Sequence, residues 1–133
     1  GDHRDLHLSL RRQRQMCIRD RGYIFEKKTN AYVQELLSEF NNLKFYAIES
    51  RGSKGTADIV FGLFNKKKGS RIWFGLQCKR GYVSLPEKNR EIKKSLDEYG
   101  MQLFYSTPMK EKKTLIEIYP DLSDWVMEWL NKD

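Results

Sequence analysis

The sequence reads Ala57-Asp58-Ile59-Val60-Phe61-Gly62-Leu63-Phe64 over one apolar segment, and this stretch decides the fold. It is short and has apolar residues at consecutive positions, which predicts a strand buried on both faces. A lysine-rich turn over residues 65–70 follows, and Arg71 to Arg80 is again apolar and aromatic. The two segments therefore predict a β-hairpin whose strands are joined by that turn.

The segments on either side of this hairpin alternate between helical and strand patterns. Apolar residues at three- and four-residue spacing predict helices at Glu26 to Phe40, at Glu87 to Tyr99 with Gly100 as the stop, and at Leu122 to Leu130. The same spacing predicts that Ile92, Leu96 and Tyr99 form a buried stripe. Further strands are predicted at Lys44 to Glu49, Gln102 to Ser106 and Thr114 to Tyr119. The order αβββαββα predicts one α/β domain over residues 22–133, with a central mixed sheet flanked by helices.

Three polar residues lie where the two hairpin strands would meet. Asp58 stands at the head of the first strand, and Gln77 and Lys79 stand at the end of the second. Side chains alternate across a strand, so Gln77 and Lys79 are expected on one face and Cys78 on the other. If the strands pair, a carboxylate, an amide oxygen and an ammonium group come together at one edge of the sheet.

Such a set suits the cleavage of phosphodiester bonds. A hard divalent cation takes carboxylate, carbonyl and water ligands, polarises a phosphate and lowers the pKa of a bound water. Asp58 would supply charge, Gln77 a neutral oxygen and Cys78 its backbone carbonyl. The Lys79 ammonium would orient the attacking water or stabilise developing negative charge.

On these residues the chain resembles the PD-(D/E)XK nuclease superfamily, and within it the archaeal-type Holliday junction resolvases and related restriction-type (Mrr-like) nucleases. The resemblance runs from Gly22 to Tyr119. Its elements are Gly22 with Glu26, the loop Gly52-Ser53-Lys54, Asp58-Ile59-Val60 and Gln77-Cys78-Lys79-Arg80-Gly81. It implies a restriction-endonuclease-like core, dependence on Mg²⁺ or Mn²⁺, and cleavage of branched or duplex DNA in recombination or repair.

The resemblance also implies roles for single residues. Asp58 and Gln77 would bind the metal with help from Glu26, and Lys79 would be catalytic. The expected contacts to DNA phosphates are Arg51, Ser53, Lys54 and Arg80. A homodimer is implied as well, because a four-way junction presents two scissile strands.

The chain departs from the family pattern at two positions. The third motif usually begins with an acid, whereas Gln77 is neutral, which weakens metal affinity and gives Glu26 more weight. Resolvases usually carry an arginine three residues before the Gly-Ser pair of the loop, where this chain has Glu49, and Arg51 lies nearer. Two alternatives therefore stand beside a resolvase: a restriction- or repair-type nuclease of duplex DNA, and a non-catalytic DNA-binding module that keeps the fold.

Simple structural interpretations are preferred for several other residues. Cys78 is expected to be a small buried apolar residue, and Lys66-Lys67-Lys68 a solvated turn. Trp125 and Trp129 follow the stripe of the last helix, so we expect them in the core or at a dimer surface rather than as platforms for bases.

The first twenty-one residues look like translated sequencing adapter rather than natural protein. Gly1 to His7, Arg11 to Gln15 and Met16 to Asp20 match successive parts of a transposon-based library adapter in one reading frame. We therefore expect a metagenomic fragment whose residues 1–21 are artefactual and disordered or non-native, and whose natural N-terminus is missing.

Excluding this stretch, which holds six arginines and three aspartates, lowers the formal net charge from +7 to +4. It also removes His3 and His7, so histidine catalysis and histidine metal ligands are excluded from the remainder. Cys78 is then the only cysteine, which excludes a disulfide framework and a cysteine-type zinc site. The sequence has no long apolar run. The expected location is the cytoplasm of a prokaryote or an infected cell.

Overall fold

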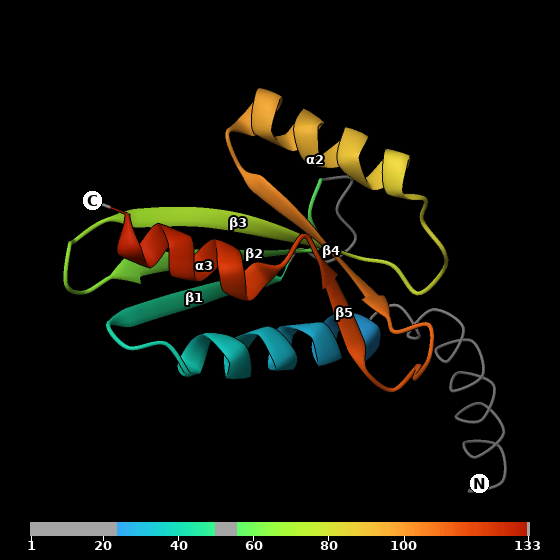
Figure 1. Cartoon of the computed structure of the whole chain (residues 1–133), viewed down its shortest axis with the longest axis horizontal. Coiled ribbons are helices and arrows are strands. Elements are labelled where there is room, and N and C mark those ends of the chain that lie inside the picture. The colour runs from blue at the N-terminus through green and yellow to red at the C-terminus, as the bar shows by residue number, and fades with distance from the viewer. Residues whose placement is uncertain (1–23, 50–55, 133) are drawn as a thin grey trace, which may run out of the picture.

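The computed structural model describes residues 24–49 and 56–132 (Figure 1). The expectations for residues 1–21 and Gly22, and those for the loop residues Arg51, Gly52, Ser53 and Lys54, lie outside the described residues.

The described chain is built around a five-stranded sheet with the order β1-β2-β3-β4-β5. β3 and β4 pair in parallel, and every other neighbouring pair is antiparallel. The predicted α/β class, a mixed sheet flanked by helices, is therefore confirmed. The strands are β1 (Leu43–Glu49), β2 (Ile59–Asn65), β3 (Arg71–Cys78), β4 (Gln102–Pro108) and β5 (Ile116–Tyr119).

The predicted hairpin is the pair β2 and β3, which runs from Ile59 opposite Leu76 to Phe64 opposite Arg71. Asn65 closes its turn: the side-chain oxygen accepts the N–H groups of Lys67 and Lys68 at 3.0 and 3.1 Å. The amide group of the same side chain donates to the Leu130 carbonyl at 3.3 Å. The Asn65 side chain therefore stabilises the turn internally and also links it to the last helix.

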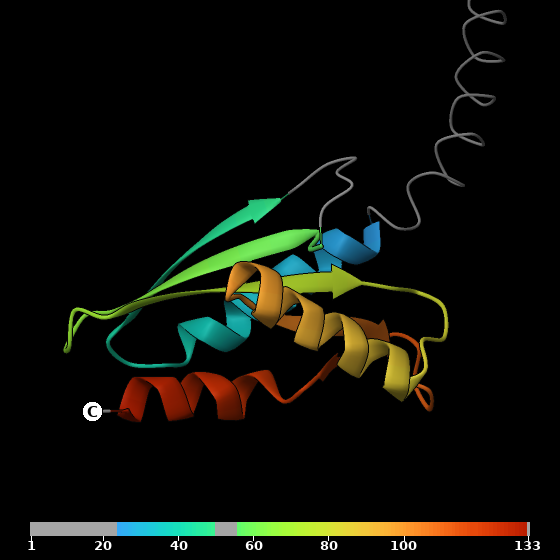
Figure 2. The ribbon, with the colours of Figure 1, turned by 90° about the horizontal axis from the view of Figure 1, so that it is seen from above.

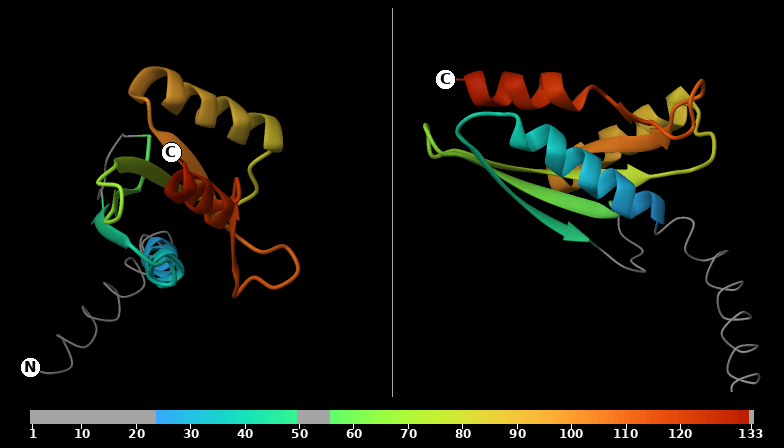
Figure 3. Two further views of the ribbon diagram at one scale, coloured as in Figure 1. Left: turned by 60° about the vertical axis from the view of Figure 1, so that its left-hand side comes forward. Right: turned by 90° about the horizontal axis from the view of Figure 1, so that it is seen from below.

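One face of the sheet is covered by the N-terminal helix, helical over residues 24–38, and by α3 (Leu122–Asn131) (Figure 3). Phe74 lies at the centre of this main core, 5.3 Å from the Phe61 ring and 5.5 Å from Trp125 between ring centroids. Trp125 also packs edge-on against Phe104. The core position expected for Trp125 is therefore confirmed. The buried residues of the main core are Val33, Leu37, Leu43, Ile59, Phe61, Leu63, Phe74, Leu76, Phe104, Leu122 and Val126.

The other face is covered by α2 (Leu85–Tyr99), which crosses over β4 (Figures 1 and 2). The Ser84 side chain caps its first turn, and Gly100 ends it in the left-handed region with φ 65°. A smaller group packs beneath it, which we name the α2-side cluster: Ala57, Leu103 and Tyr105, with Val60, Val83, Ile92 and Met101.

Two predicted burial patterns are wrong on this face. Leu96 is 44% and Tyr99 64% exposed, and the residue that α2 buries is Ser95, whose hydroxyl donates to the Met101 carbonyl at 2.8 Å. On β2, Val60 and Phe64 are half-buried rather than buried. The reason is shared: a single helix over β4 leaves the outer part of this face open along β1, β2 and β3. None of the helices in the described ranges is long and apolar enough to cross a membrane.

Candidate active site

Asp58 lies where the ladder between β2 and β3 ends. Its backbone N–H donates to the Leu76 carbonyl at 2.8 Å, although Leu76 faces Ile59 in the regular register. The two neighbours of Asp58 point to opposite faces, Ile59 into the main core and Ala57 into the α2-side cluster. In a regular strand both would share one face, so the ladder slips here in the manner of a β-bulge.

This slip brings the Asp58 carboxylate onto the strand that carries the second motif. The carboxylate accepts the backbone N–H of Cys78 at 2.8 Å, in place of a ladder carbonyl. A hydrogen bond from a backbone N–H to a carboxylate is short and strong because the acceptor is charged. Asp58 therefore contacts the end of β3 at Gln77-Cys78-Lys79, and the contact is to the Cys78 backbone.

Two further carboxylates lie on the same side of the sheet, near the start of the N-terminal helix. Partial burial raises the pKa of Glu26, and the negative charges of Asp58 and Glu49 raise it further. Glu49 ends β1 and accepts a hydrogen bond at 2.7 Å from the Asn30 side chain of the helix. Glu26 is thus close enough to Asp58 for their charges to interact, and its metal-binding role stays a prediction. Glu49 was missed as a member of this acidic group, because its sequence position suggested only the loss of an arginine.

Cys78 lies under these carboxylates and packs against the main core. Burial raises the pKa of its thiol to about 12, a hydrogen bond with Thr29 opposes the rise, and the charges of Asp58, Glu26 and Glu49 add to it. Thr29 also shares a 2.8 Å hydrogen bond with Ser106 on β4, and both hydroxyls are buried. The thiol is thus protonated and packed against the core, although Cys78 is half-buried rather than fully buried as expected.

Gln77 approaches the strand end from the opposite face. It faces Tyr105 of the α2-side cluster in the parallel ladder. Its side-chain oxygen is buried and has no hydrogen-bond partner among the described residues. Lys79 follows directly, its backbone held by the Ser106 carbonyl at 2.9 Å and its side chain exposed. The Asp58 carboxylate and the Gln77 side chain are therefore both at the end of β3 but on opposite faces of the sheet. The alternation of side chains along a strand did not predict this arrangement.

A divalent cation suits the chemistry of this group. The donors near Asp58 are carboxylate oxygens that repel one another. The Gln77 oxygen lacks a partner within the described ranges but lies on the other face of the sheet. No group of three or more His, Cys, Asp or Glu side chains in residues 24–49 and 56–132 is arranged to hold a metal ion. Mg²⁺ commonly keeps several waters and takes only one or two carboxylates, so Asp58 with Glu26 meets that need.

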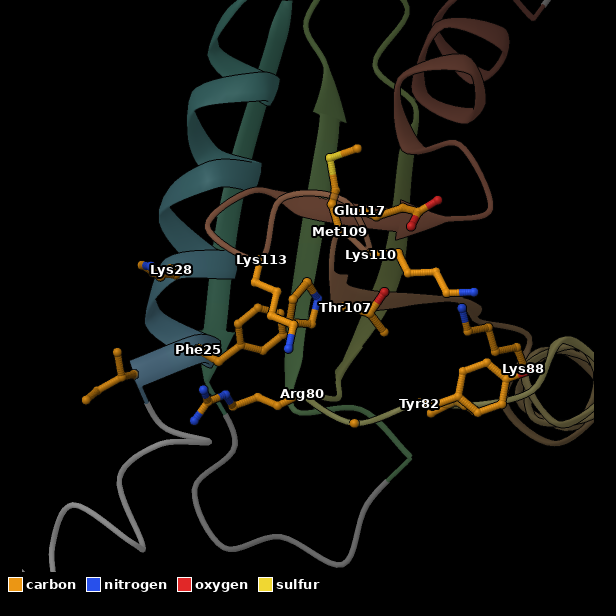
Figure 4. Close-up of a pocket in the computed structure, with 14 residues that line it drawn as sticks. Phe25, Lys28, Arg80, Tyr82, Lys88, Thr107, Met109, Lys110, Lys113 and Glu117 are labelled. Carbon is orange, nitrogen blue, oxygen red and sulfur yellow. The ribbon is translucent and has the colours of Figure 1, made fainter.

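A cleft of about 1010 Å³ opens beside this group (Figure 4). Its walls come from the start of the N-terminal helix, the segment between β3 and α2, the first turn of α2, and the β4–β5 hairpin (Figure 4). Arg80 lines it, as do five residues that sequence analysis did not single out: Lys28, Tyr82, Lys88, Lys110 and Lys113. These positions are far apart in the sequence, so no local pattern could have predicted that they line one cleft.

The chain was compared with protein-family models, with curated proteins and with solved structures, and none of the three comparisons found a match.

Proposed function

We propose that this protein is a DNA endonuclease that depends on Mg²⁺ or Mn²⁺, has a restriction-endonuclease-like core, and acts on Holliday junctions or other branched DNA as a homodimer. The observation that carries the proposal is the 2.8 Å hydrogen bond that fixes the Asp58 carboxylate to the backbone of Cys78. It joins the acid of one motif to the Gln-x-Lys end of the next strand, beside two more carboxylates.

The metal roles are proposed for Asp58, Gln77 and the Cys78 carbonyl, and Glu26 would add negative charge. Asp58 and Glu26 lie on one side of the sheet, whereas the Gln77 side chain is buried against the α2-side cluster and would have to turn toward the carboxylates to join them. Glu49 adds more, which offsets the neutral amide of Gln77. When bound, the cation would polarise the phosphodiester and lower the pKa of a water. Lys79, whose side chain is exposed at the strand end, would orient that water or stabilise charge on the phosphate.

The Arg80 side chain, in the wall of the adjoining cleft, would contact the phosphate backbone. Arg51, Ser53 and Lys54, which lie outside the described residues, are proposed to contact phosphates as well.

Cleavage assays with two variants test the activity. In Mg²⁺ or Mn²⁺ the unmodified chain should cut a labelled four-way junction. Asp58→Asn keeps an oxygen that can accept the Cys78 N–H but removes the charge, and Lys79→Ala removes the ammonium. Each should lower the cleavage rate by about 10²–10³-fold, the range seen when one preorganised electrostatic group is lost. The matched control is Lys67→Ala, an exposed lysine in the β2–β3 turn, which should cut like the unmodified chain.

The same assay separates the proposal from its alternatives. Faster cleavage of linear duplex than of the junction would favour a restriction- or repair-type nuclease. The neutral Gln77 favours a second candidate, a DNA-binding module without activity. Binding of DNA without cleavage in either metal would establish that module and overturn the nuclease.

A further inference from the structure

We propose that the basic cleft beside the acidic group binds an unpaired DNA strand, so that among branched substrates one with single-stranded DNA next to a duplex is preferred to a fully paired four-way junction. The inference deepens the proposed function and rests on it for the identity of the ligand as DNA.

The cleft adjoins the proposed active site along two segments of the chain. Phe25 lines it and directly precedes Glu26, whereas Arg80 and Gly81 line it and directly follow Lys79. A strand lying in the cleft would therefore pass close to the backbone that carries Glu26 and Lys79, although neither of these side chains lines the cleft.

The charge of the cleft suits a polyanion. Five described lining residues are cationic, namely Lys28, Arg80, Lys88, Lys110 and Lys113, and Glu117 is the one carboxylate among them. They come from four parts of the chain, namely the N-terminal helix, the segment after β3, α2 and the β4–β5 loop, so cations are present in more than one wall (Figure 4). Two backbone hydrogen bonds of 2.9 Å, from Met109 to Leu115 and from Leu115 to Lys112, hold the hairpin loop that carries Lys110 and Lys113. Lysine and arginine side chains that neutralise phosphates supply most sequence-independent affinity for nucleic acid.

An exposed aromatic ring distinguishes this cleft from a merely basic surface. Tyr82 is 89% exposed, whereas the other aromatic lining residue, Phe25, is 7% exposed and packed in place. A tyrosine left in solvent beside cations provides a platform on which a base can stack. In a duplex the base faces already stack on one another, so such a platform favours unpaired bases. At about 1010 Å³ the cleft exceeds the space that most small ligands need, roughly 300–1,000 Å³, and suits a short run of nucleotides.

Fluorescence anisotropy on the full chain tests this inference. Binding is measured in EDTA, so that cleavage plays no part, to a blunt duplex and to the same duplex with a short thymidine tail. The tailed duplex should bind more tightly. Tyr82→Ala should weaken binding of the tailed duplex about tenfold, as expected for the loss of one stacked base, and leave the blunt duplex unchanged. Tyr82→Phe keeps the ring and should restore the affinity.

The matched control is Tyr46→Ala, because Tyr46 is 68% exposed on β1 and does not line the cleft. It should bind both substrates like the unmodified chain. The double variant Lys110→Ala with Lys113→Ala should bind the tailed duplex more weakly and reduce its salt dependence by about 0.7 in log–log slope per lysine.

Equal affinity for tailed and blunt duplex would overturn the inference, as would equal effects of Tyr82→Ala and Tyr46→Ala. Displacement of the tailed duplex by polyglutamate as readily as by a thymidine oligonucleotide would also overturn it, because charge alone would then explain binding. Cleavage of DNA without a Tyr82 effect would refute the inference and leave the nuclease intact. A Tyr82-dependent tail preference without cleavage would refute the nuclease and leave the binding site.

Discussion

The two faces of the sheet are built in different ways. On the face under the N-terminal helix and α3, Phe61, Phe74 and Phe104 are fully buried and pack against one another and against Trp125. On the α2 face, Trp73 of β3 is 49% exposed and Tyr46 of β1 is 68% exposed. The same strands thus carry a closed core on one side and an open surface on the other.

The closed face and the boundary between the two faces have different roles, the first in stability and the second in the proposed chemistry. The closed face buries the larger apolar area and should supply most of the free energy of folding. Asp58 lies at the end of β2 where the chain passes from one face to the other, since Ala57 and Ile59 point to opposite sides. The backbone of a polar residue at such a boundary is fixed by the packed core, while its side chain stays outside that core.

The largest expected effect compares two neighbouring aromatic residues of β3. Phe74→Ala should lower the free energy of unfolding by about 3–5 kcal/mol, because it removes a ring from the centre of the main core. Trp73→Ala should cost about 1 kcal/mol, because the larger Trp73 ring is half exposed and lies over Gly62. Chemical denaturation of both variants measures the difference.

Phe74→Leu keeps the comparison measurable if the alanine variant does not fold, with an expected cost of about 1 kcal/mol. Equal destabilisation by Phe74→Ala and Trp73→Ala would show that the α2 face is covered in solution, and the contrast between the faces would be lost.

A smaller effect is expected for the buried hydroxyl pair of the closed face. Thr29→Val and Ser106→Ala should each cost about 1–2 kcal/mol, because each leaves the other hydroxyl buried without its 2.8 Å partner. The double variant should cost less than the sum of the two, which a double-mutant cycle in denaturant measures. Ser38→Ala is the control: its exposed hydroxyl donates to the Glu35 carbonyl at 2.6 Å on the helix surface, so we expect a change within about 0.5 kcal/mol. Strict additivity of Thr29→Val and Ser106→Ala would contradict the pairing.

Much of the fold could be predicted from local pattern. The hairpin of β2 and β3, the order of the elements and the helix stop at Gly100 follow from apolar spacing and turn residues, which act over a few neighbouring positions. The exposure of Leu96 and Tyr99 could not be predicted in this way, because periodicity gives the apolar side of α2 but not how much sheet lies beneath it.

The candidate site was predictable only in its residue types. Asp58 and the Gln77-Cys78-Lys79 run were identified from spacing. Asp58 contacts this run through the Cys78 backbone, whereas the Gln77 side chain lies on the other face. The register of β2 and β3 shifts by one residue at Asp58, whose charge interacts with Glu26. This shift depends on how two strands pair, so the sequence of one strand could not predict it. The cleft is formed by four parts of the chain that are distant in sequence, so its lysines could be found only once the chain was folded.

The smallest effect concerns Cys78. Its thiol packs on the closed face, whereas its backbone N–H donates to Asp58 in the candidate site. Burial raises the pKa of this thiol from an ordinary 9.0 to about 12, so at pH 8 it should react with iodoacetamide far more slowly in the folded than in the denatured chain. Because the folded state holds this proton more tightly, the stability that the thiol contributes is present below pH 9 and declines as the pH rises toward about 12. Mass spectrometry of a Cys17→Ser chain, in which Cys78 is the sole thiol, follows the alkylation. Rapid alkylation of the folded chain at pH 8 would show that Cys78 lies on the open side of the sheet. The carboxylates around Cys78 could then not be placed on the closed face either.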